Sequence, residues 1–219
     1  AGVIGNNKDG DDDVTATFAA TSTYKKDGDK LSLKGGYNYN TTRDGNEPFK
    51  VQTNKGSATV RYDRRLSRGL SLVTLADYVY NGTNEASVNT VKGAIGLGVP
   101  LINTPSTQLT LSLGPSFQWG NGGSDCDTDS ACGRTYPGAS FTTELDWTPN
   151  PSFRISLDNN FSALAASELK PTNSFGATIK YFPSITSGMF TSLQFLSTYN
   201  SIAKPEIDNT VNGQVGIEF

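Results

Sequence analysis

Apolar and polar side chains alternate with a period of two residues along much of this chain, and this pattern limits the folds that the chain can adopt. In residues 107–119, TQLTLSLGPSFQW, leucine, phenylalanine or tryptophan occupies almost every second position, and polar residues occupy most positions between them. Successive side chains of a β-strand point to opposite faces, so this segment predicts a strand with one apolar and one polar face. The pattern recurs along the chain to Phe219. We therefore expect an all-β protein.

Turn residues divide the alternating pattern into strands. The predicted strands are 13–24, 30–40, 56–65, 70–81, 90–99, 108–119, 137–147, 152–161, 173–182, 189–199 and 209–219. The connections between them alternate between tight turns and longer loops, as in outer-membrane barrels, which have short periplasmic turns and long external loops. A closed barrel of this kind has an even number of strands. We therefore expect an additional strand in residues 1–5, starting at or before Ala1, and about 12 strands in a single antiparallel transmembrane β-barrel.

Composition narrows the class of protein. Of the 219 residues 35% are hydrophobic, and the mean hydropathy is −0.39. No apolar run approaches the roughly 18 residues that a membrane-spanning helix needs, so the chain either is soluble or crosses a membrane as strands. A net charge of −3 with scattered lysines and arginines gives no electrostatic argument for a nucleic-acid partner. Even turn spacing without a linker favours a single domain, residues 1–219.

Aromatic residues on the apolar parity gather at the two ends of the predicted strands. On the long-loop side they are Tyr37, Tyr39, Tyr78, Tyr80, Phe117, Trp119, Phe161 and Tyr199. On the short-turn side they are Tyr24, Tyr62, Trp147, Phe153, Tyr181 and Phe219. Aliphatic residues such as Leu33, Ile95, Leu111 and Leu193 lie between them. This order is typical of a barrel with aromatic girdles at both membrane interfaces. A soluble β-sandwich or a soluble closed barrel is the alternative.

Charged residues of both signs occupy the opposite, inward parity. They are Lys34, Arg61, Asp63, Asp77, Lys92, Glu144, Asp146, Arg154, Asp158, Lys180 and Glu218. Opposite charges in a confined interior pair with one another, because an isolated buried charge is costly. One interpretation is a narrow, weakly selective pore for small hydrophilic solutes or ions. The other is an ion-paired interior that fills the barrel without conducting.

The remaining candidate sites give little indication of catalysis or metal binding. The chain has no histidine, which excludes a Ser-His nucleophile and a histidine general base, and we expect no enzymatic activity, no cofactor and no metal centre. Cys126 and Cys132 lie in a Gly/Ser/Asp-rich loop, which predicts a loop-closing disulfide made in an oxidising compartment. The acidic segments 9–13 and 125–129 are interpreted as solvated loops; Ca²⁺ bridging to lipopolysaccharide is the alternative.

Four segments carry a resemblance to a known family. They are Gly5-Asn6 before a Thr-rich strand, VRYDRRLSRGLSL (60–72), GAIGLGVPL (93–101) and YNSIAKPEIDNTVNGQVGIEF (199–219). The chain resembles the salt-induced outer-membrane-protein family, long catalogued as a domain of unknown function, over nearly its whole length. The resemblance implies an outer-membrane barrel of uncertain physiological role, with no catalytic residues to carry over.

The end of the chain resembles the signal read by the barrel-assembly machinery, through Val215, Ile217 and Phe219. No cleavable signal precedes Ala1, so we expect mature or trimmed sequence. The partners expected are outer-membrane lipids, lipopolysaccharide and the assembly machinery, at the bacterial outer membrane. The leading function is a passive pore or an envelope-adaptation protein. The alternative is a non-conducting barrel that binds partners through its external loops.

Overall fold

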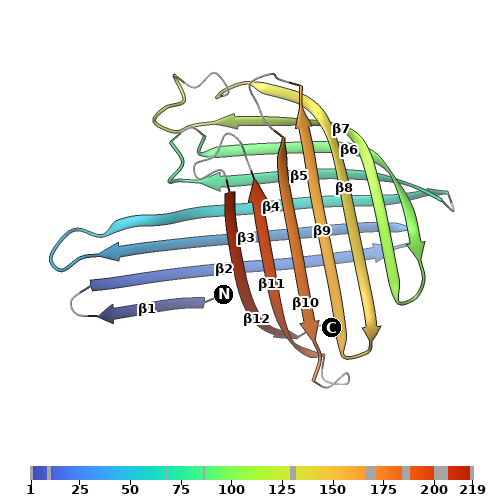
Figure 1. The fold of residues 1–219 in the computed structure, drawn as a ribbon, viewed down its shortest axis with the longest axis horizontal. Helices are drawn as coiled ribbons and strands as arrows, with labels where there is room; N and C mark the ends of the chain where they lie inside the picture. The colour runs from blue at the N-terminus through green and yellow to red at the C-terminus, as the bar shows by residue number, and fades with distance from the viewer. Residues whose placement is uncertain are drawn as a thin grey trace. The chain divides into compact units, whose positions relative to one another are not determined.

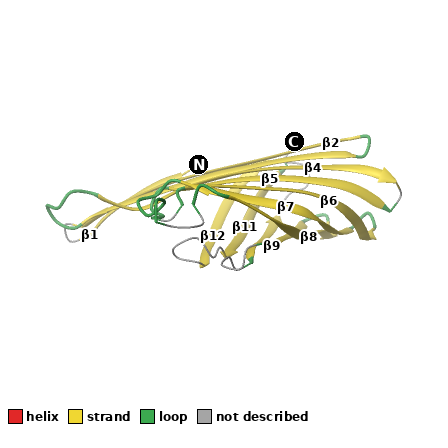
Figure 2. Ribbon diagram, turned by 90° about the horizontal axis from the view of Figure 1, so that it is seen from above, coloured by secondary structure: helices red, strands yellow, loops and turns green. Residues whose placement is uncertain are grey.

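The structure, a computed structural model, describes residues 2–8, 11–67, 69–85, 87–128, 132–165, 171–183, 188–199 and 207–217. Strands are the regular elements in these ranges (Figure 2). Over the same ranges, no helix has the length and apolar character required to cross a membrane.

The protein is an antiparallel sheet of 12 strands in which each strand pairs with its neighbours in the sequence (Figure 1). The strands are β1 (Gly2–Lys8), β2 (Asp11–Lys26), β3 (Asp29–Arg43), β4 (Lys50–Ser67), β5 (Leu70–Asn81), β6 (Asn89–Asn103), β7 (Thr107–Asn121), β8 (Thr135–Asn150), β9 (Phe153–Leu164), β10 (Thr172–Tyr181), β11 (Met189–Tyr199) and β12 (Ile207–Ile217). All predicted strands are present, including the first one. Closure of the sheet into a barrel stays a prediction.

Several strands are longer than their hydrophobic patterns indicate, and β4 and β8 show why. β4 begins at Lys50, whereas the apolar alternation begins near residue 56, because the polar segment 50–55 continues the ladder with β3 as far as the pair of Lys50 and Thr42. The connection between the predicted strands 30–40 and 56–65 therefore shortens to residues 44–49. β8 continues to Asn150 through a register shift that begins after Trp147. Pro149 lies within this shift, as expected for a residue that cannot donate a ladder hydrogen bond.

The chain forms two compact units. Unit 1 contains Ala1–Arg64, Thr74–Ala94 and Phe117–Tyr136, and therefore β1 to β3, most of β4 and β5, and the ends of β6, β7 and β8. Its first hairpin pairs Gly5 with Val14, and β2 and β3 pair without interruption from Asp12 opposite Arg43 to Lys26 opposite Asp29. The predicted single domain stays a prediction.

Unit 2 contains Arg65–Val73, Ile95–Ser116 and Pro137–Phe219. Its main part is the run of adjacent strands from β8 to β12 (Figure 1). In this run, even-numbered residues lie opposite even-numbered residues at every regular ladder position, as in the row Asp146, Ser156, Thr178 and Gln194. One face of these strands is therefore built from even positions and the other from odd positions.

Polar and apolar side chains are distributed in the opposite way to a water-soluble protein. In the described part of the chain, the buried apolar side chains are Val73 and Phe182. The buried polar side chains are Ser32, Thr41, Asn84, Ser87, Thr90, Ser112, Gln118, Ser140, Thr142, Ser162 and Thr172. Large apolar side chains are exposed on many strands, for example Leu113 (63% exposed), Leu193 (56%) and Val215 (76%). The polar side of the sheet is thus the more enclosed one.

Candidate functional site

The even-numbered side chains of β8 to β12, with those of residues just beyond the strand ends, form what we call the polar face of unit 2. Its acidic part comes from Glu144 on β8 and Asp158 on β9, which lie directly opposite each other. The next residue along the ladder is Gly176, and a Cβ atom built there would lie 2.8 Å from a carboxylate oxygen of Asp158. The Asp158 carboxylate therefore lies against the β10 backbone at Gly176, in space that a Cβ atom at this position would occupy. The Ser156 hydroxyl donates a hydrogen bond of 2.8 Å to Oδ1 of Asp146.

The basic part of the same face lies at the tight-turn end of the strands. Arg154 on β9 and Lys180 on β10 are direct cross-strand neighbours. The Arg154 guanidinium carbon lies 4.7 Å from the centre of the Phe182 ring, and Nζ of Lys180 lies 4.5 Å from the centre of the Phe190 ring. The two rings are themselves 5.8 Å apart. Each cation is thus held over an aromatic face, an arrangement that attracts it electrostatically.

Unit 1 has its own polar face, in which charges of opposite sign meet. Arg61 and Asp63 are two residues apart on β4 and form an ion pair of 2.9 Å, with both side chains largely buried. Nε of Arg61 also donates to the Asp63 carboxylate, at 2.9 Å to Oδ2. Lys30 on β3 lies directly opposite Asp63. On the later strands of this unit, Asp77 attracts the half-buried Lys92 electrostatically.

A family comparison identifies the chain. The model of a family described as "Protein of unknown function, DUF481" matches residues 5–212. The chain belongs to this family. The match agrees with the predicted membership of a domain of unknown function, and the salt-induced name stays a prediction. No curated protein matches the chain in sequence.

Solved structures give distant likenesses to this DUF481 protein. A KdgM porin is 10% identical with a TM-score of 0.48, and the match covers 95% of this chain and 92% of that one. A NanC porin is 8% identical with a TM-score of 0.48, covering 94% and 99%. A bacterial polysaccharide outer-membrane secretin is 8% identical with a TM-score of 0.47, covering 95% and 91%.

The structure brings several of the predicted inward charges together. Arg61 and Asp63 form an ion pair, and Glu144 lies directly opposite Asp158. Lys34 is exposed, and its cross-strand neighbours are Thr21 and Thr59. Glu218, and Phe219 of the assembly signal, lie outside the described residues. Val215 and Ile217, the other two assembly-signal residues, are exposed. That the predicted charges line one common lumen stays a prediction.

Three residues belong to the polar faces although they are absent from the predicted set. Lys30 has the same parity as Lys34. It is the first residue of the predicted strand 30–40, where the alternating pattern gives little indication of which face a side chain belongs to. Phe182 and Phe190 share the even parity of Lys180, and their apolar character pointed to the opposite face. Strand parity, applied without regard to residue type, is the signal that identifies all three.

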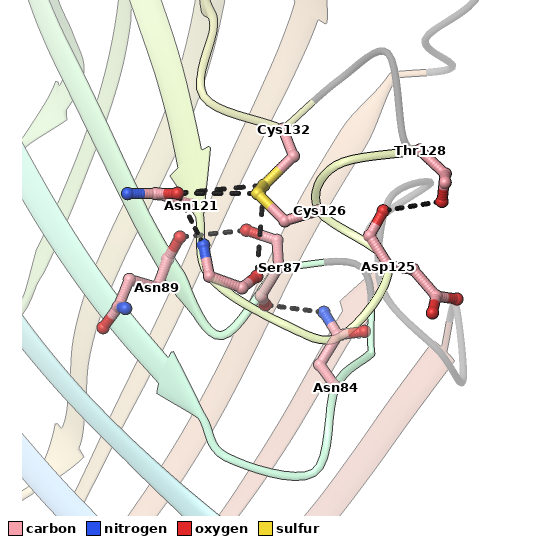
Figure 3. Close-up of a disulfide and its surroundings, with 9 residues drawn as sticks. Asn84, Ser87, Asn89, Asn121, Asp125, Cys126, Thr128 and Cys132 are labelled. Atoms are coloured by element: carbon pink, nitrogen blue, oxygen red, sulfur yellow. Dashed lines mark hydrogen bonds between the residues drawn. A yellow bond between two sulfur atoms is a disulfide. The ribbon is translucent and has the colours of Figure 1, made fainter.

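A disulfide joins Cys126 and Cys132, as the sequence predicts (Figure 3). Sγ of Cys126 lies 3.5 Å from Oδ1 of Asn121, the last residue of β7. The Gly133 N–H donates a hydrogen bond of 2.7 Å to the carbonyl of Gly120, which connects the other end of the ring to the same strand end. The disulfide ring is therefore attached to the end of β7.

The disulfide loop also contacts the preceding long connection, residues 82–88 (Figure 3). The Asp125 N–H donates to the carbonyl of Glu85, and the Val88 N–H donates to the carbonyl of Gly122, both at 2.9 Å. Asn84 is buried and donates through Nδ2 to the carbonyl of Ser87 at 2.7 Å. Backbone N–H and C=O groups are strong hydrogen-bonding groups. These bonds therefore join the described residues of the two loops.

Metal binding by these loops has no structural support in the described ranges. There, no cluster of three or more Cys, Asp or Glu side chains is arranged to hold a metal ion. The side chains of the acidic segment 9–13 lie outside the described part of the chain. The interpretation of the acidic segments as solvated loops, and its alternative of Ca²⁺ bridging to lipopolysaccharide, both stay predictions.

Proposed function

We propose that this protein is a bacterial outer-membrane β-barrel whose polar faces line a narrow passage for small hydrophilic solutes or ions. The observation that carries the proposal is the inverted distribution of side chains, in which hydroxyl and amide groups are buried while leucine, isoleucine, valine and aromatic residues are exposed. In water such an apolar surface favours aggregation. In a bilayer the same surface is solvated by hydrocarbon, and the antiparallel ladder satisfies the backbone polar groups internally.

The positions of the aromatic residues support a membrane orientation. Exposed rings at the tight-turn ends of strands come from Tyr24, Trp147, Phe153 and Tyr181. Exposed rings near the long-loop ends come from Tyr78, Phe117 and Phe161. Exposed aliphatic residues occupy the middle of the strands, as Ile95 and Leu193 do on β6 and β11. Two aromatic girdles around an apolar band are the signature of a transmembrane barrel.

The polar faces support passive conduction of weak charge selectivity. Arg154 and Lys180 stand on the same face as Glu144, Asp146 and Asp158, so an ion that passes along it meets both signs. Fixed charges beside a low-dielectric wall act strongly on nearby ions. Because both signs are present, the preference of the basic residues for anions and that of the acidic residues for cations offset each other. With no histidine in the chain and both signs on one face, a non-enzymatic role in permeation or envelope adaptation is the simplest one.

A non-conducting barrel is the second candidate, in which the external loops bind a partner. The observation that favours it is the connection between two loops, residues 82–85 and 87–88 of one and 122–128 and 132–134 of the other, through backbone hydrogen bonds, with a disulfide in the second loop. Planar-bilayer recordings separate the two candidates. We expect stepwise ion currents after insertion of the purified, refolded protein. In a KCl gradient, the double substitution Arg154→Gln and Lys180→Gln should shift the reversal potential towards cation preference.

The control for insertion is heat-modifiable gel migration of the same preparation, because a folded outer-membrane barrel migrates differently from its boiled form. If the wild type and the double variant are both folded by this criterion and inserted into the bilayer, yet neither carries an ion current, the pore is refuted. The interior of the barrel would then be filled by side chains. The loop-binding candidate would then be the remaining one.

A further inference from the structure

The described residues of the connection between β5 and β6 include one that lies on the polar side of β7. Gln118 of β7 is buried, whereas Phe117 before it is exposed, so even-numbered positions here belong to the polar side. Gly120 therefore faces the same side as Gln118. A Cβ atom built on Gly120 would lie 2.5 Å from Oγ of Ser87. Ser87 thus lies against the polar face of unit 1, at the long-loop end of β7.

Hydrogen bonds of the loops hold this segment in place (Figure 3). We call four of its described residues the cover: Asn84, Glu85, Ser87 and Val88. Oγ of Ser87 donates to the carbonyl of Asn89 at 3.0 Å, and the backbone of Glu85 and Val88 bonds to the disulfide loop at 2.9 Å. Asn84 and Ser87 are 5% and 4% exposed. The cover is therefore positioned by hydrogen bonds that do not involve Gln118.

Gln118 has no hydrogen-bond partner in its enclosed position. Its side chain is 2% exposed, and neither Nε2 nor Oε1 forms a hydrogen bond. An amide in water forms hydrogen bonds through both atoms, and its burial without replacement partners costs free energy. The closed arrangement of the cover therefore contains a penalty. An open arrangement, in which water reaches the amide, does not.

From these contacts we infer that the cover is a gate, which closes the long-loop end of the polar face of unit 1 and opens to admit water and small polar solutes to Gln118. The inference rests on the proposed function, because it assigns the gate to the solute path. In the open arrangement the Gln118 amide regains its hydrogen bonds, which offsets part of the loss of the contacts that the cover makes when closed. The open arrangement is then a minor state of a two-state equilibrium.

Thr90 on β6 is a suitable position for a reporter of opening. The Val88 N–H bonds to the carbonyl of Gly122, and continuing this antiparallel pairing by two residues places Thr90 opposite Gly120. Thr90 is 6% exposed. The two native cysteines are bonded to each other, so Thr90→Cys supplies the one free thiol of the chain. Its reaction with a water-soluble, sulfonate-bearing thiosulfonate, in protein refolded in detergent, measures how often the cover opens.

We expect Thr90→Cys to react about 10- to 1,000-fold more slowly than Lys34→Cys, an exposed position on the polar face of unit 1. Adding Gln118→Met, which keeps the side-chain length and removes the amide, should slow the reaction at position 90 by about fivefold or more, because the closed arrangement loses its penalty. The matched control is Gln108→Met, which removes an exposed amide from the polar side of β7 and should leave the rate unchanged.

Gly120→Ala provides a test in the other direction. Its Cβ atom displaces Ser87, so the reaction at position 90 should be several-fold faster than without this substitution. This variant keeps the proposal testable if Gln118→Met does not refold. Heat-modifiable migration confirms that each variant is folded before labelling.

Reaction of Thr90→Cys at the rate of Lys34→Cys would mean that nothing covers the position. No reaction, even with Gly120→Ala, would mean that the cover is fixed. Either result overturns the gate, as do equal rates with and without Gln118→Met, or an equal effect of Gln108→Met. Labelling needs no ion current, so the gate and the pore fail separately. Slow labelling that depends on Gln118, without conductance, refutes the pore and keeps an opening cover. Conductance with labelling that ignores Gln118 does the reverse.

Discussion

The lipid-facing assignment of the apolar surface is most directly tested at Leu193 on β11. Its side chain is 56% exposed and belongs to the odd, apolar face, with Ile179 and Gly213 opposite it. Gln194, the next residue, belongs to the even, polar face and lies opposite Thr178 and Asn212. Replacing each in turn by arginine therefore introduces the same side chain at the same depth on opposite faces.

The depth of Leu193 follows from its place in the strand, between Met189 and Tyr199. At a rise of about 3.4 Å per residue, Leu193 lies about 14 Å along the strand from Met189 and about 20 Å from Tyr199. A strand tilt of about 40° converts these lengths to depths of about 10 and 16 Å, which places Leu193 near the middle of an apolar band about 25 Å tall.

An arginine at that depth on the lipid side should lower the free energy of unfolding by about 2–4 kcal/mol. This corresponds to a change in the folding equilibrium of between about 30-fold and about 1,000-fold. For Gln194→Arg we expect a change below about 1 kcal/mol, as for a substitution at a solvated position.

Reversible urea unfolding in phospholipid vesicles, followed by tryptophan fluorescence, measures both values. Heat-modifiable migration of each variant confirms that it is folded before the titration. Equal penalties at Leu193 and Gln194, or no penalty at Leu193, would refute the assignment of the odd-numbered face to lipid and with it the membrane orientation of unit 2.

Two further predictions concern close contacts and the loops. Gly114→Ala should destabilise the protein by about 1–3 kcal/mol, because a Cβ atom there would overlap the carbonyl oxygen of Ile95 and the backbone must move. Gly213→Ala meets nothing within 4 Å and should change stability by less than about 0.5 kcal/mol, so equal urea midpoints for the two variants would contradict the close approach of β6 and β7. Reduction of the disulfide should leave the sheet folded, because its short ring constrains only the loop, but should raise amide exchange at Asp125 and Val88, whose N–H groups hold the two loops together. Unchanged exchange at both amides in the reduced protein would mean that the disulfide does not support the loop pair.

The strands and their faces were predictable from the sequence, because both depend on local alternation. Hydrophobic periodicity places Leu111, Leu113 and Phe117 on one side of β7 and Ser112 and Gln118 on the other, and the exposure of these residues follows the same division. The first strand was predictable from the even strand count of a closed barrel, and the cysteine spacing predicted the disulfide. To predict these features, it is not necessary to know which residues of neighbouring strands lie opposite each other.

The extent of β4 and the cross-strand contacts on the polar face depend on the register of the sheet. Lys50 belongs to β4 only because β3 extends far enough to pair with it, and no apolar alternation marks that segment. Arg154 and Lys180 are distant in the sequence, and a shift of one residue between β9 and β10 would place them on opposite faces. Phe190 has an apolar side chain, yet its parity in β11 places it beneath a lysine on the polar face. Cross-strand contacts of this kind depend on loop lengths and ladder hydrogen bonds over the whole sheet, so only the tertiary structure brings the two cations and their rings together.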